Sequence, residues 1–367
     1  MERIFSMGKQ RVLIQDIADS LHLSRTTVSK VLNGNKNVSE ANRKRVLQKA
    51  SELNYKQFSY ISESLENDSE KAPVSKGNKT NGNIAFLFHK TPDRYHIVSS
   101  LLVTFEQEIR KDGYTLSFYS VECEDIEAGK LPSTFDVENI DAILCAELFD
   151  KNYSRLLCSL NKPVLFADSY STITRDNLKA DILLMESKDS LSEMVRRIIT
   201  ANGFSKVGFV GAANHCLSFY ERWSGFCSAL LDCGLSLDKS SCILSEDDPK
   251  YFSRNWMINH LKAMDPLPEL FVCANDAIAI HLIHSLKELN ISVPSDVMVT
   301  GFDNGCSSIL PDPSLTTVDV NSADMGKMAA RQLLSRISNP ALPYSRLYLQ
   351  TEILFRQSAS ISSKEWL

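Results

Sequence analysis

Apolar residues in the first 55 positions recur at the spacing of amphipathic helices. They fall at positions i, i+3, i+4 and i+7, or at some of these positions. This spacing is typical of a helix with one buried face. Ser24 and Ser39 stand where N-caps would open a second and a third helix, and Asn33-Gly34 would end the second. The pattern predicts three short helices around one small core between 12 and 55. Its apolar members are Ile14, Ile17, Ala18 and Leu21, then Val28, Val31 and Leu32, then Val46, Leu47, Ala50 and Leu53.

A different pattern begins after a polar segment at 66–82, whose Asn, Ser, Lys, Pro and Gly residues predict a flexible linker. From there, short apolar runs alternate with amphipathic helical stretches that end at glycines such as Gly113 and Gly203. Apolar strands that alternate with helices are typical of parallel sheets covered on both faces. This part of the chain is too long for one small sheet, so we expect an α/β body of two similar lobes. The expected strands are 84–88, 115–119, 140–145, 164–168, 207–210, 270–273 and 297–302.

Charge is distributed unevenly along the chain. The whole chain has 40 Lys and Arg against 45 Asp and Glu, a net charge of −5. Residues 1–60 hold 11 basic and 5 acidic side chains, a charge of +6, which leaves −11 for the rest. A basic first segment joined to an acidic body favours contact of that segment with a polyanion such as nucleic acid. The alternative is an ordinary surface of mixed acidic and basic side chains, which would give a smaller difference in charge between the two parts of the chain.

Several classes of protein are disfavoured by what the sequence lacks. The stretch 1–10 has no apolar core of signal-peptide length, and no apolar run approaches the roughly 20 residues of a membrane span, so we expect a cytoplasmic protein. The nine cysteines include no C-x-x-C pair, so we interpret them as reduced packing residues rather than metal ligands. No G-x-S-x-G, H-E-x-x-H or Walker motif occurs, and His281 and His284 have no evident third ligand. We therefore expect neither an enzyme nor a cofactor.

The outward residues of the predicted second helix carry the first functional signal. A helix-turn-helix inserts the N-terminal end of its second helix into the major groove, so the side chains outside the apolar stripe decide what it binds. Arg25 and Thr26 are candidates for contacts to base edges, whereas Thr27, Ser29 and Ser39 suit phosphate oxygens. An ordinary solvated helix with incidental hydroxyls is the alternative. The outward set has two cations, three hydroxyls and no carboxylate: Arg25, Thr26, Thr27, Ser29 and Lys30.

The first segment resembles the DNA-binding head of the lactose-repressor (LacI/GalR) family. The resemblance rests on IQDIADSLHLSRTTVSKVLNGNKNVSEANRKRVLQKASELNY, since the hallmarks of that family are TVSxVLN and VSxxxRxxV. It implies that Arg25, Thr26 and Lys30 face the groove and that Asn33 and Ser39 lie near the DNA backbone. The remaining members of the expected DNA-contacting set are Ser24, Thr27 and Ser29.

The body resembles the same family along its length. The resemblance rests on GFSKVGFVG, ERWSGFCSALLDCGL, PELFVCANDAIAIHLIHSL, VPSDVMVTGFDN and LTTV followed by ADMGKMAA, in the family's order. It implies a periplasmic-binding-protein type I fold, with an effector held between two lobes and contacted by Asp168, Arg222 and Asp276. Paired carboxylates with an arginine suit the hydroxyls of a sugar or nucleoside. Met185 and Tyr251 lie near the place where the family has a stacking side chain.

Each of these five residues also has a purely structural interpretation. Asp276 would cap the helix that follows its strand, Arg222 would form an ion pair between helices, and Asp168 would close a loop. Met185 and Tyr251 would pack in the core.

The connection between head and body departs from the family. The family follows its head with a Pro-Asn step and a short helix whose leucine wedges into the minor groove, whereas this chain reads YKQFSYISESLENDSE. Leu65 is the nearest candidate wedge, reached by allowing one extra residue, and the neighbouring Glu63, Glu66 and Asp68 would repel phosphates. We therefore expect looser coupling between body and head.

Together these observations predict an all-α helix-turn-helix head joined to an α/β body of the periplasmic-binding-protein type. We expect a sequence-specific transcriptional repressor that binds a near-palindromic operator as a homodimer and responds to a small carbohydrate or nucleoside effector. The alternative is a DNA-binding regulator whose body binds a protein partner. A sugar-transport protein would need a secretory signal and no basic head. The expected boundaries are 1–57 for the head, 58–82 for hinge and linker, 83–357 for the body and 358–367 for the tail, with a first lobe at about 83–175 and 314–340 and a second at about 176–313 and 341–357.

Overall fold

The computed structural model of the chain divides into two compact units, Met1–Val74 and Ser75–Leu367. Most of the expected hinge and linker lies outside the residues that the structure describes. These are 14–21, 23–32, 82–89, 97–245, 248–305 and 312–361, together with Ser39, Asn42, Arg45, Val46, Lys49 and Ser308.

The first unit contains two described helices with buried apolar residues. Arg45, from the segment that follows them, donates from Nη2 to the carbonyl oxygen of Leu21 at 3.1 Å, which satisfies a free acceptor at the end of the first helix. Asn42, Arg45, Val46 and Lys49 are helical, in agreement with the expected third helix. The described helices are α1 (Ile14–Leu21) and α2 (Arg25–Leu32), and the buried apolar residues are Ile17, Ala18, Val28, Val31 and Val46.

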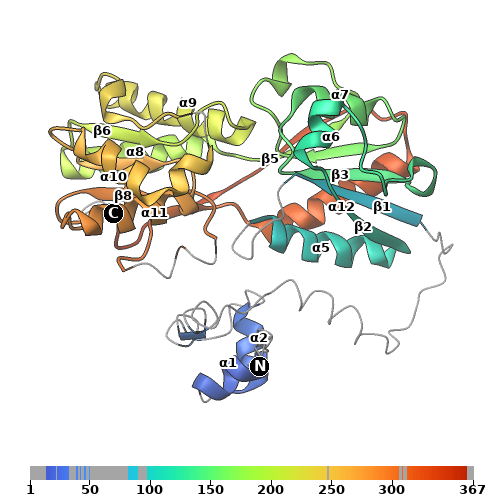
Figure 1. Ribbon diagram of the computed structural model, residues 1–367, viewed down its shortest axis with the longest axis horizontal. Helices are drawn as coiled ribbons and strands as arrows, with labels where there is room; N and C mark the ends of the chain where they lie inside the picture. The colour runs from blue at the N-terminus through green and yellow to red at the C-terminus, as the bar shows by residue number, and fades with distance from the viewer. Residues whose placement is uncertain are drawn as a thin grey trace, which may run out of the picture. The chain divides into compact units, whose positions relative to one another are not determined.

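The first lobe of the body is built on a six-stranded parallel sheet with the strand order β10-β5-β4-β3-β1-β2. Along β1, Ile84 and Phe86 face one core and Ala85 and Leu87 face another, because successive side chains of a strand point to opposite faces. Helices α6 and α7 cover one face of this sheet and α5 and α12 the other (Figure 1). The elements are β1 (Gly82–Phe88), α5 (Ile97–Lys111), β2 (Tyr114–Ser120), α6 (Cys123–Ala128), β3 (Ala142–Ala146), α7 (Lys151–Cys158), β4 (Val164–Ala167), β5 (Asp181–Met185), α12 (Ser322–Ser338) and β10 (Arg346–Leu349).

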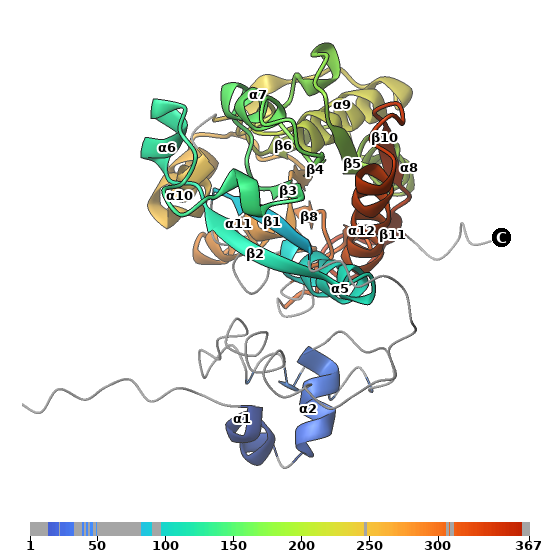
Figure 2. The ribbon, with the colours of Figure 1, turned by 90° about the vertical axis from the view of Figure 1, so that its right-hand side faces the viewer.

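Two helices on one face of the first lobe come from distant parts of the sequence. Figure 2 shows α5 and α12 side by side, and the hydroxyl of Thr104 in α5 donates to the carbonyl of Ala323 in α12 at 2.8 Å. A side chain at Gly326 would meet the carbonyl oxygen of Leu101 at 2.2 Å. The two helices therefore approach closely enough to require a glycine at that position.

The second lobe has a three-stranded parallel sheet, β6-β7-β8, which single bridges extend at Ile243 and Thr316. Helix α8 ends at Gly203, whose φ of +68° lies in the left-handed region and whose N–H donates to the carbonyl of Ile199 at 2.8 Å. The antiparallel pair β9 and β11 completes the lobe. The elements are α8 (Lys188–Asn202), β6 (Val207–Val210), α9 (Leu217–Asp232), α10 (Arg254–Lys262), β7 (Leu270–Cys273), α11 (Asp276–Glu288), β8 (Met298–Thr300), β9 (Thr317–Asp319) and β11 (Glu352–Leu354).

Within the described residues the chain crosses between the lobes three times, after β5, after β9 and after β10. The N–H of Glu186 donates to the carbonyl of Leu349 at 2.8 Å, and the hydroxyl of Thr351 donates to the carbonyl of Glu186 at 2.9 Å. The first and third crossovers are thus hydrogen-bonded to each other.

The lobe boundaries differ from those that the sequence predicts. Strands β5 and β10 belong to the sheet of the first lobe, although the pattern predicts both segments in the second. Conversely, Thr316 accepts from the N–H of Gly301 at 2.9 Å, so the segment before β9 belongs to the second lobe. Ser358 and Ala359, expected in the tail, are buried there. Apolar patterns mark a strand but do not say which sheet it joins.

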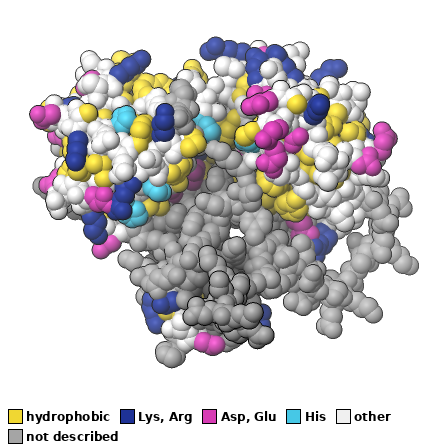
Figure 3. Space-filling model, viewed as in Figure 1, with side chains coloured by type: hydrophobic (Ala, Val, Ile, Leu, Met, Phe, Trp, Pro, Cys, Tyr) yellow, Lys and Arg dark blue, Asp and Glu magenta, His cyan; other side chains and the backbone are white. Residues whose placement is uncertain are grey.

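Acidic and basic side chains are interspersed over both lobes on the face drawn in Figure 3. None of the helices in the described part of the chain is long and apolar enough to cross a membrane.

Candidate functional site

Helix α2 begins with a hydrogen-bonded cap. The Oγ of Ser24 accepts from the backbone N–H of Thr27 at 3.0 Å, and the hydroxyl oxygens of these two residues lie 2.8 Å apart. The cap satisfies one of the free N–H donors in the first turn. Both residues belong to the expected DNA-contacting set, and both also fix the start of the helix.

Two side chains of that set are exposed at the same end of α2. Arg25 and Thr26 face solvent, whereas Val28 of the next turn is fully buried. The helix therefore turns its apolar stripe inward and presents a cation and a hydroxyl at its N-terminal end. Ser39 is also exposed. The side chains of Ser29 and Lys30, and the whole of Asn33 and Leu65, lie outside the described residues.

A second candidate site lies at the junction of the two lobes. The carboxyl ends of parallel strands are the usual place for a ligand in α/β folds. Strands of both lobes end here, and they bring together four of the five expected effector contacts. Asp168 follows β4, Met185 ends β5, Asp276 follows β7, and Arg222 lies in the second turn of α9.

Arg222 is almost fully buried, with 2% of its surface exposed. Its Nη1 donates to the carbonyl of Ala274 at 2.7 Å. Its Nη2 donates to Asp303 Oδ1 at 2.9 Å and to the sulfur of Met185 at 3.3 Å. The guanidinium lies 3.9 Å from the ring centre of Phe302, which adds a cation–π contact. Its Nε is buried without a partner among the described residues.

Asp276 is buried between segments of the second lobe, with 3% of its surface exposed. Its Oδ1 accepts from the hydroxyl of Thr317 at 2.6 Å, and its Oδ2 accepts from the N–H of Gly305 at 2.9 Å. Burial raises the pKa of this carboxyl well above its usual value, and the charge of Asp303 raises it further. The cap of α11 is Asn275, which accepts from a first-turn N–H at 2.9 Å. The interpretation of Asp276 as a helix cap is therefore wrong.

Asp168 connects the two lobes. Its φ of +65° is left-handed, a conformation in which aspartate is enriched. Its Oδ2 accepts from the hydroxyl of Ser218 at 2.6 Å, and its Oδ1 accepts from the N–H of Ser169 at 2.7 Å and that of Ser218 at 3.3 Å. Because Ser218 lies in the first turn of α9, Asp168 does more than close its own loop.

Tyr251 lies in the core of the second lobe rather than with the other four expected contacts at the junction of the lobes. It belongs to the 3₁₀ helix η4 (Asp248–Phe252) and is fully buried. Its hydroxyl donates to the carbonyl of Ser245 at 2.8 Å, and its ring meets Trp256 edge to face at 5.4 Å. These contacts favour the packing interpretation of this residue.

Sequence reasoning missed several partners in the cluster. Phe302 and Asp303 stand in the GFDN motif, so their proximity to the site has a sequence signal. Ser218 and Thr317 have none, because only the folded chain brings them to Asp168 and Asp276.

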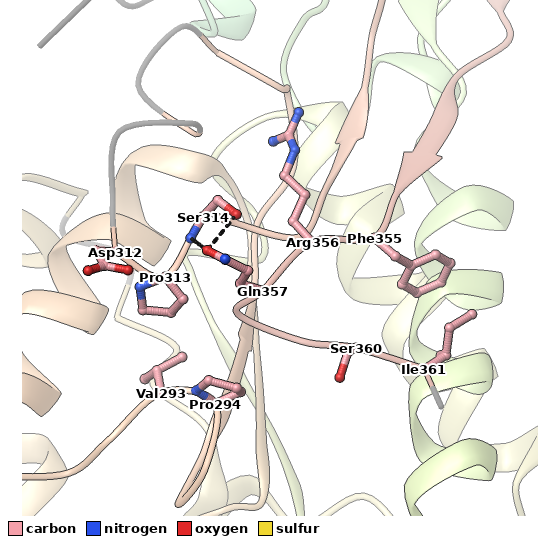
Figure 4. A pocket seen from close by; sticks show the side chains of 10 residues that line it. All are labelled: Val293, Pro294, Asp312, Pro313, Ser314, Phe355, Arg356, Gln357, Ser360 and Ile361. Atoms are coloured by element: carbon pink, nitrogen blue, oxygen red, sulfur yellow. Dashed lines mark hydrogen bonds between the residues drawn. The ribbon is translucent and has the colours of Figure 1, made fainter. Parts of the chain in front are cut away.

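A cavity of about 960 Å³ in the second lobe is a separate feature. Figure 4 shows the residues that line it, which come from 293–294, 312–314, 355–357 and 360–361. The N–H and the hydroxyl of Ser314 both donate to Gln357 Oε1 at 3.1 Å. None of the five expected effector contacts lines this cavity.

Comparison with known proteins agrees with the division into head and body. Residues 13–57 match the family model for bacterial regulatory proteins of the lacI family. Residues 197–359 match the model for a periplasmic-binding-protein-like domain.

Relatives that resemble the chain over most of its length include two proteins named HTH-type transcriptional repressor PurR. The protein of Mannheimia succiniciproducens is 24% identical over 347 residues, which cover 94% of this chain and 98% of the relative. That of Glaesserella parasuis is 27% identical over 331 residues, covering 88% and 89%.

Solved structures show the same fold. A complex of the transcriptional regulator CelR with cellobiose has a TM-score of 0.65 at 19% identity and covers 95% of this chain and 100% of its own. The lac repressor dimer bound to operator and the anti-inducer ONPF has a TM-score of 0.62 at 18% identity, covering 95% and 99%. With the capped helix α2 and the two-lobed parallel fold, these matches lead to one conclusion. The chain belongs to the lacI family of bacterial regulatory proteins and is a DNA-binding transcriptional regulator with a periplasmic-binding-protein-like body.

Proposed function

We propose that the chain is a transcriptional repressor that binds a near-palindromic operator as a homodimer and responds to a small polar effector between its lobes. It would act in the cytoplasm, where operator DNA lies. The charge of +6 in residues 1–60 and the exposed Arg25 and Thr26 support contact with DNA. Support for a dimer comes from the lac repressor, which was solved as a dimer on its operator.

The arrangement around Arg222 carries the effector part of the proposal. The buried Nε of Arg222 lacks an acceptor, and an oxygen of a bound polyol would supply one. The carboxyl groups of Asp168 and Asp276 would form hydrogen bonds with hydroxyls of the same molecule. These groups favour a carbohydrate or nucleoside over an apolar ligand, and the cellobiose complex of CelR supports the carbohydrate class.

Operator binding is tested by selecting binding sites from random duplex DNA with the full chain. We expect a near-palindromic consensus. Arg25→Ala should relax the preference at one base pair in each half-site, at about 1–3 kcal/mol of discrimination. Thr27→Ala should weaken binding to all sequences alike, and Arg331→Ala, at an exposed position of α12, is the matched control. Equal losses from Arg25→Ala and Thr27→Ala would contradict the assigned roles.

Effector binding is tested by thermal-shift and calorimetric screening of a sugar and nucleoside panel. A ligand of the proposed site should bind the wild-type chain and lose most of its affinity in Asp276→Asn. Asp324→Asn, at an exposed position of α12, should leave binding unchanged. A chain that binds operator but no member of the panel would contradict the effector and favour a protein partner.

A further inference from the structure

One further side-chain pair joins the lobes, next to the candidate effector contact Arg222. The hydroxyl of Tyr348 in β10 donates to Glu221 Oε1 in α9 at 2.7 Å. Strand β10 belongs to the first lobe and α9 to the second. Glu221 directly precedes Arg222 in the same helix, so the pair acts on the element that carries the candidate effector contact.

The carboxyl group of Glu221 is poorly solvated in this arrangement. Its second oxygen, Oε2, is buried and has no partner in the part of the chain that the structure describes. Burial raises the pKa of Glu221 to about 7, and the nearby carboxylates of Asp168 and Glu186 add to that rise. Tyr348 and Arg222 favour the ionised form of Glu221 and therefore oppose this rise in its pKa. The side chain therefore changes charge near neutral pH while it bridges the lobes.

Tyr348 is the donor of this pair over the same pH range. Burial raises the pKa of its hydroxyl, and the hydrogen bond to Glu221 raises it further, while Arg346 lowers it. The tyrosine keeps its proton where the glutamate titrates. Any pH dependence of the contact therefore comes from Glu221.

We propose that Tyr348 and Glu221 form a latch that holds α9 of the second lobe against β10 of the first, and that loss of the Glu221 proton loosens it. If the lobes separate at this edge, both carboxylate oxygens gain water and the ionised form is no longer penalised. Ionisation therefore shifts the equilibrium toward separation. The inference rests on the proposed function only in that α9 also carries Arg222.

Two backbone amides in α9 report directly on the separation of the lobes. The N–H of Leu217 donates to the carbonyl of Ser169 at 2.7 Å, and the N–H of Ser218 donates to Asp168 Oδ1 at 3.3 Å. Both acceptors belong to the first lobe. These amides exchange with solvent deuterium only when their hydrogen bonds across the junction open. Their protection therefore measures how often the two lobes separate at this place.

The test is hydrogen exchange followed by mass spectrometry on the full chain, without DNA or effector, from pH 6 to pH 8. After correction for the intrinsic exchange rate, protection of the peptide around Leu217 should fall roughly tenfold in the wild-type chain over this range. Glu221→Gln cannot ionise and should stay protected throughout. Tyr348→Phe should be less protected than the wild type at pH 8, whereas Tyr344→Phe, at an exposed tyrosine ahead of the same strand, should match the wild type.

The proposal is overturned if wild-type protection does not depend on pH, or if Glu221→Gln follows the wild-type pH dependence. It is also overturned if Tyr348→Phe cannot be distinguished from Tyr344→Phe. Because the measurement uses neither operator nor effector, its failure leaves the proposed function standing. Failure of the operator or effector assays would likewise leave the latch standing.

Discussion

Arg222 and Asp303 form an ion pair of 2.9 Å in which the arginine is 2% exposed and the aspartate 17%. The same aspartate also opposes ionisation of the buried Asp276. Asp303 thus compensates the charge of the arginine, and it adds to burial in raising the pKa of Asp276. Asp303, which is outside the expected effector-contacting set, therefore acts on two members of that set.

Replacing Asp303 should destabilise the body strongly. Asp303→Ala leaves Arg222 buried without its counter-charge, which costs about 3–5 kcal/mol when one partner of a buried pair is removed. Asp303→Asn keeps an acceptor oxygen and should cost less. Urea unfolding of the body measures both, with Asp324→Asn of the exposed Lys327 pair as a control that changes stability by at most about 0.5 kcal/mol. Similar values for Asp303→Ala and the control would show that the pair contributes little.

Asp276 should make the stability of the body depend on pH. Its pKa is raised in the folded chain, chiefly by burial. The stability that the protonated side chain contributes is therefore fully present below the usual pKa of aspartate, and it is lost as pH rises through the pKa in the folded chain. Asp276→Asn has a similar shape and no charge. The variant should therefore gain stability relative to the wild type as pH rises, which unfolding at several pH values measures. A difference that stays constant with pH would contradict the raised pKa.

The elements that the sequence predicts well are those with a strong local pattern. The strands Val207–Val210 and Leu270–Cys273 agree at both ends with the expected strands, since each run is short, fully buried and preceded by a charged residue. Ile17 and Ala18 of α1 and Val28 and Val31 of α2 are buried as their helical spacing predicts. In these cases the local period alone decides the structure.

Sequence reasoning failed where the structure depends on contacts between distant segments. Strand β5 has the apolar run DILLM, but only its pairing with β4 and β10 assigns it to the first lobe. Arg222 was singled out by resemblance, whereas its partner Asp303 comes from a different strand end, 81 residues away. Glu221 begins the segment ERWSGFCSALLDCGL, but nothing in the sequence pairs it with Tyr348. Such pairs are fixed by tertiary packing, which no local pattern records.

The cap of α2 should be worth a measurable part of the stability of the head. Ser24→Ala removes the acceptor for the N–H of Thr27 and should cost about 1 kcal/mol. Ser24→Asn supplies another acceptor and should stay close to the wild type. Thermal unfolding of the head, followed by helical circular dichroism, compares the two variants. A loss of the same size in both would show that the hydroxyl acts in some way other than capping.

The pair Arg336–Asp181 should decide whether β10 stays in the first lobe. Arg336 Nε and Nη2 each donate to one oxygen of Asp181 at 2.9 Å, with side chains 3% and 1% exposed, and the N–H of Ser345 ahead of β10 donates to the same carboxylate at 2.8 Å. Arg336→Lys cannot form the two-pronged contact and should cost about 2–4 kcal/mol in urea unfolding at pH 7. Arg331→Lys, at an exposed position of the same helix, is the control.

The effect of Arg336→Lys should shrink in acid. Burial alone would raise the pKa of Asp181, but Arg336 and the N–H of Ser345 outweigh it and lower that pKa. The stability that this carboxylate contributes is therefore present above its usual value and is lost as pH falls through the lowered one. Unfolding measured from pH 7 towards pH 3 should bring the variant and the wild type closer together. A cost that is unchanged in acid would mean that Arg336 stabilises the lobe through its carbonyl contacts, such as that to Pro343 at 2.8 Å, rather than through Asp181.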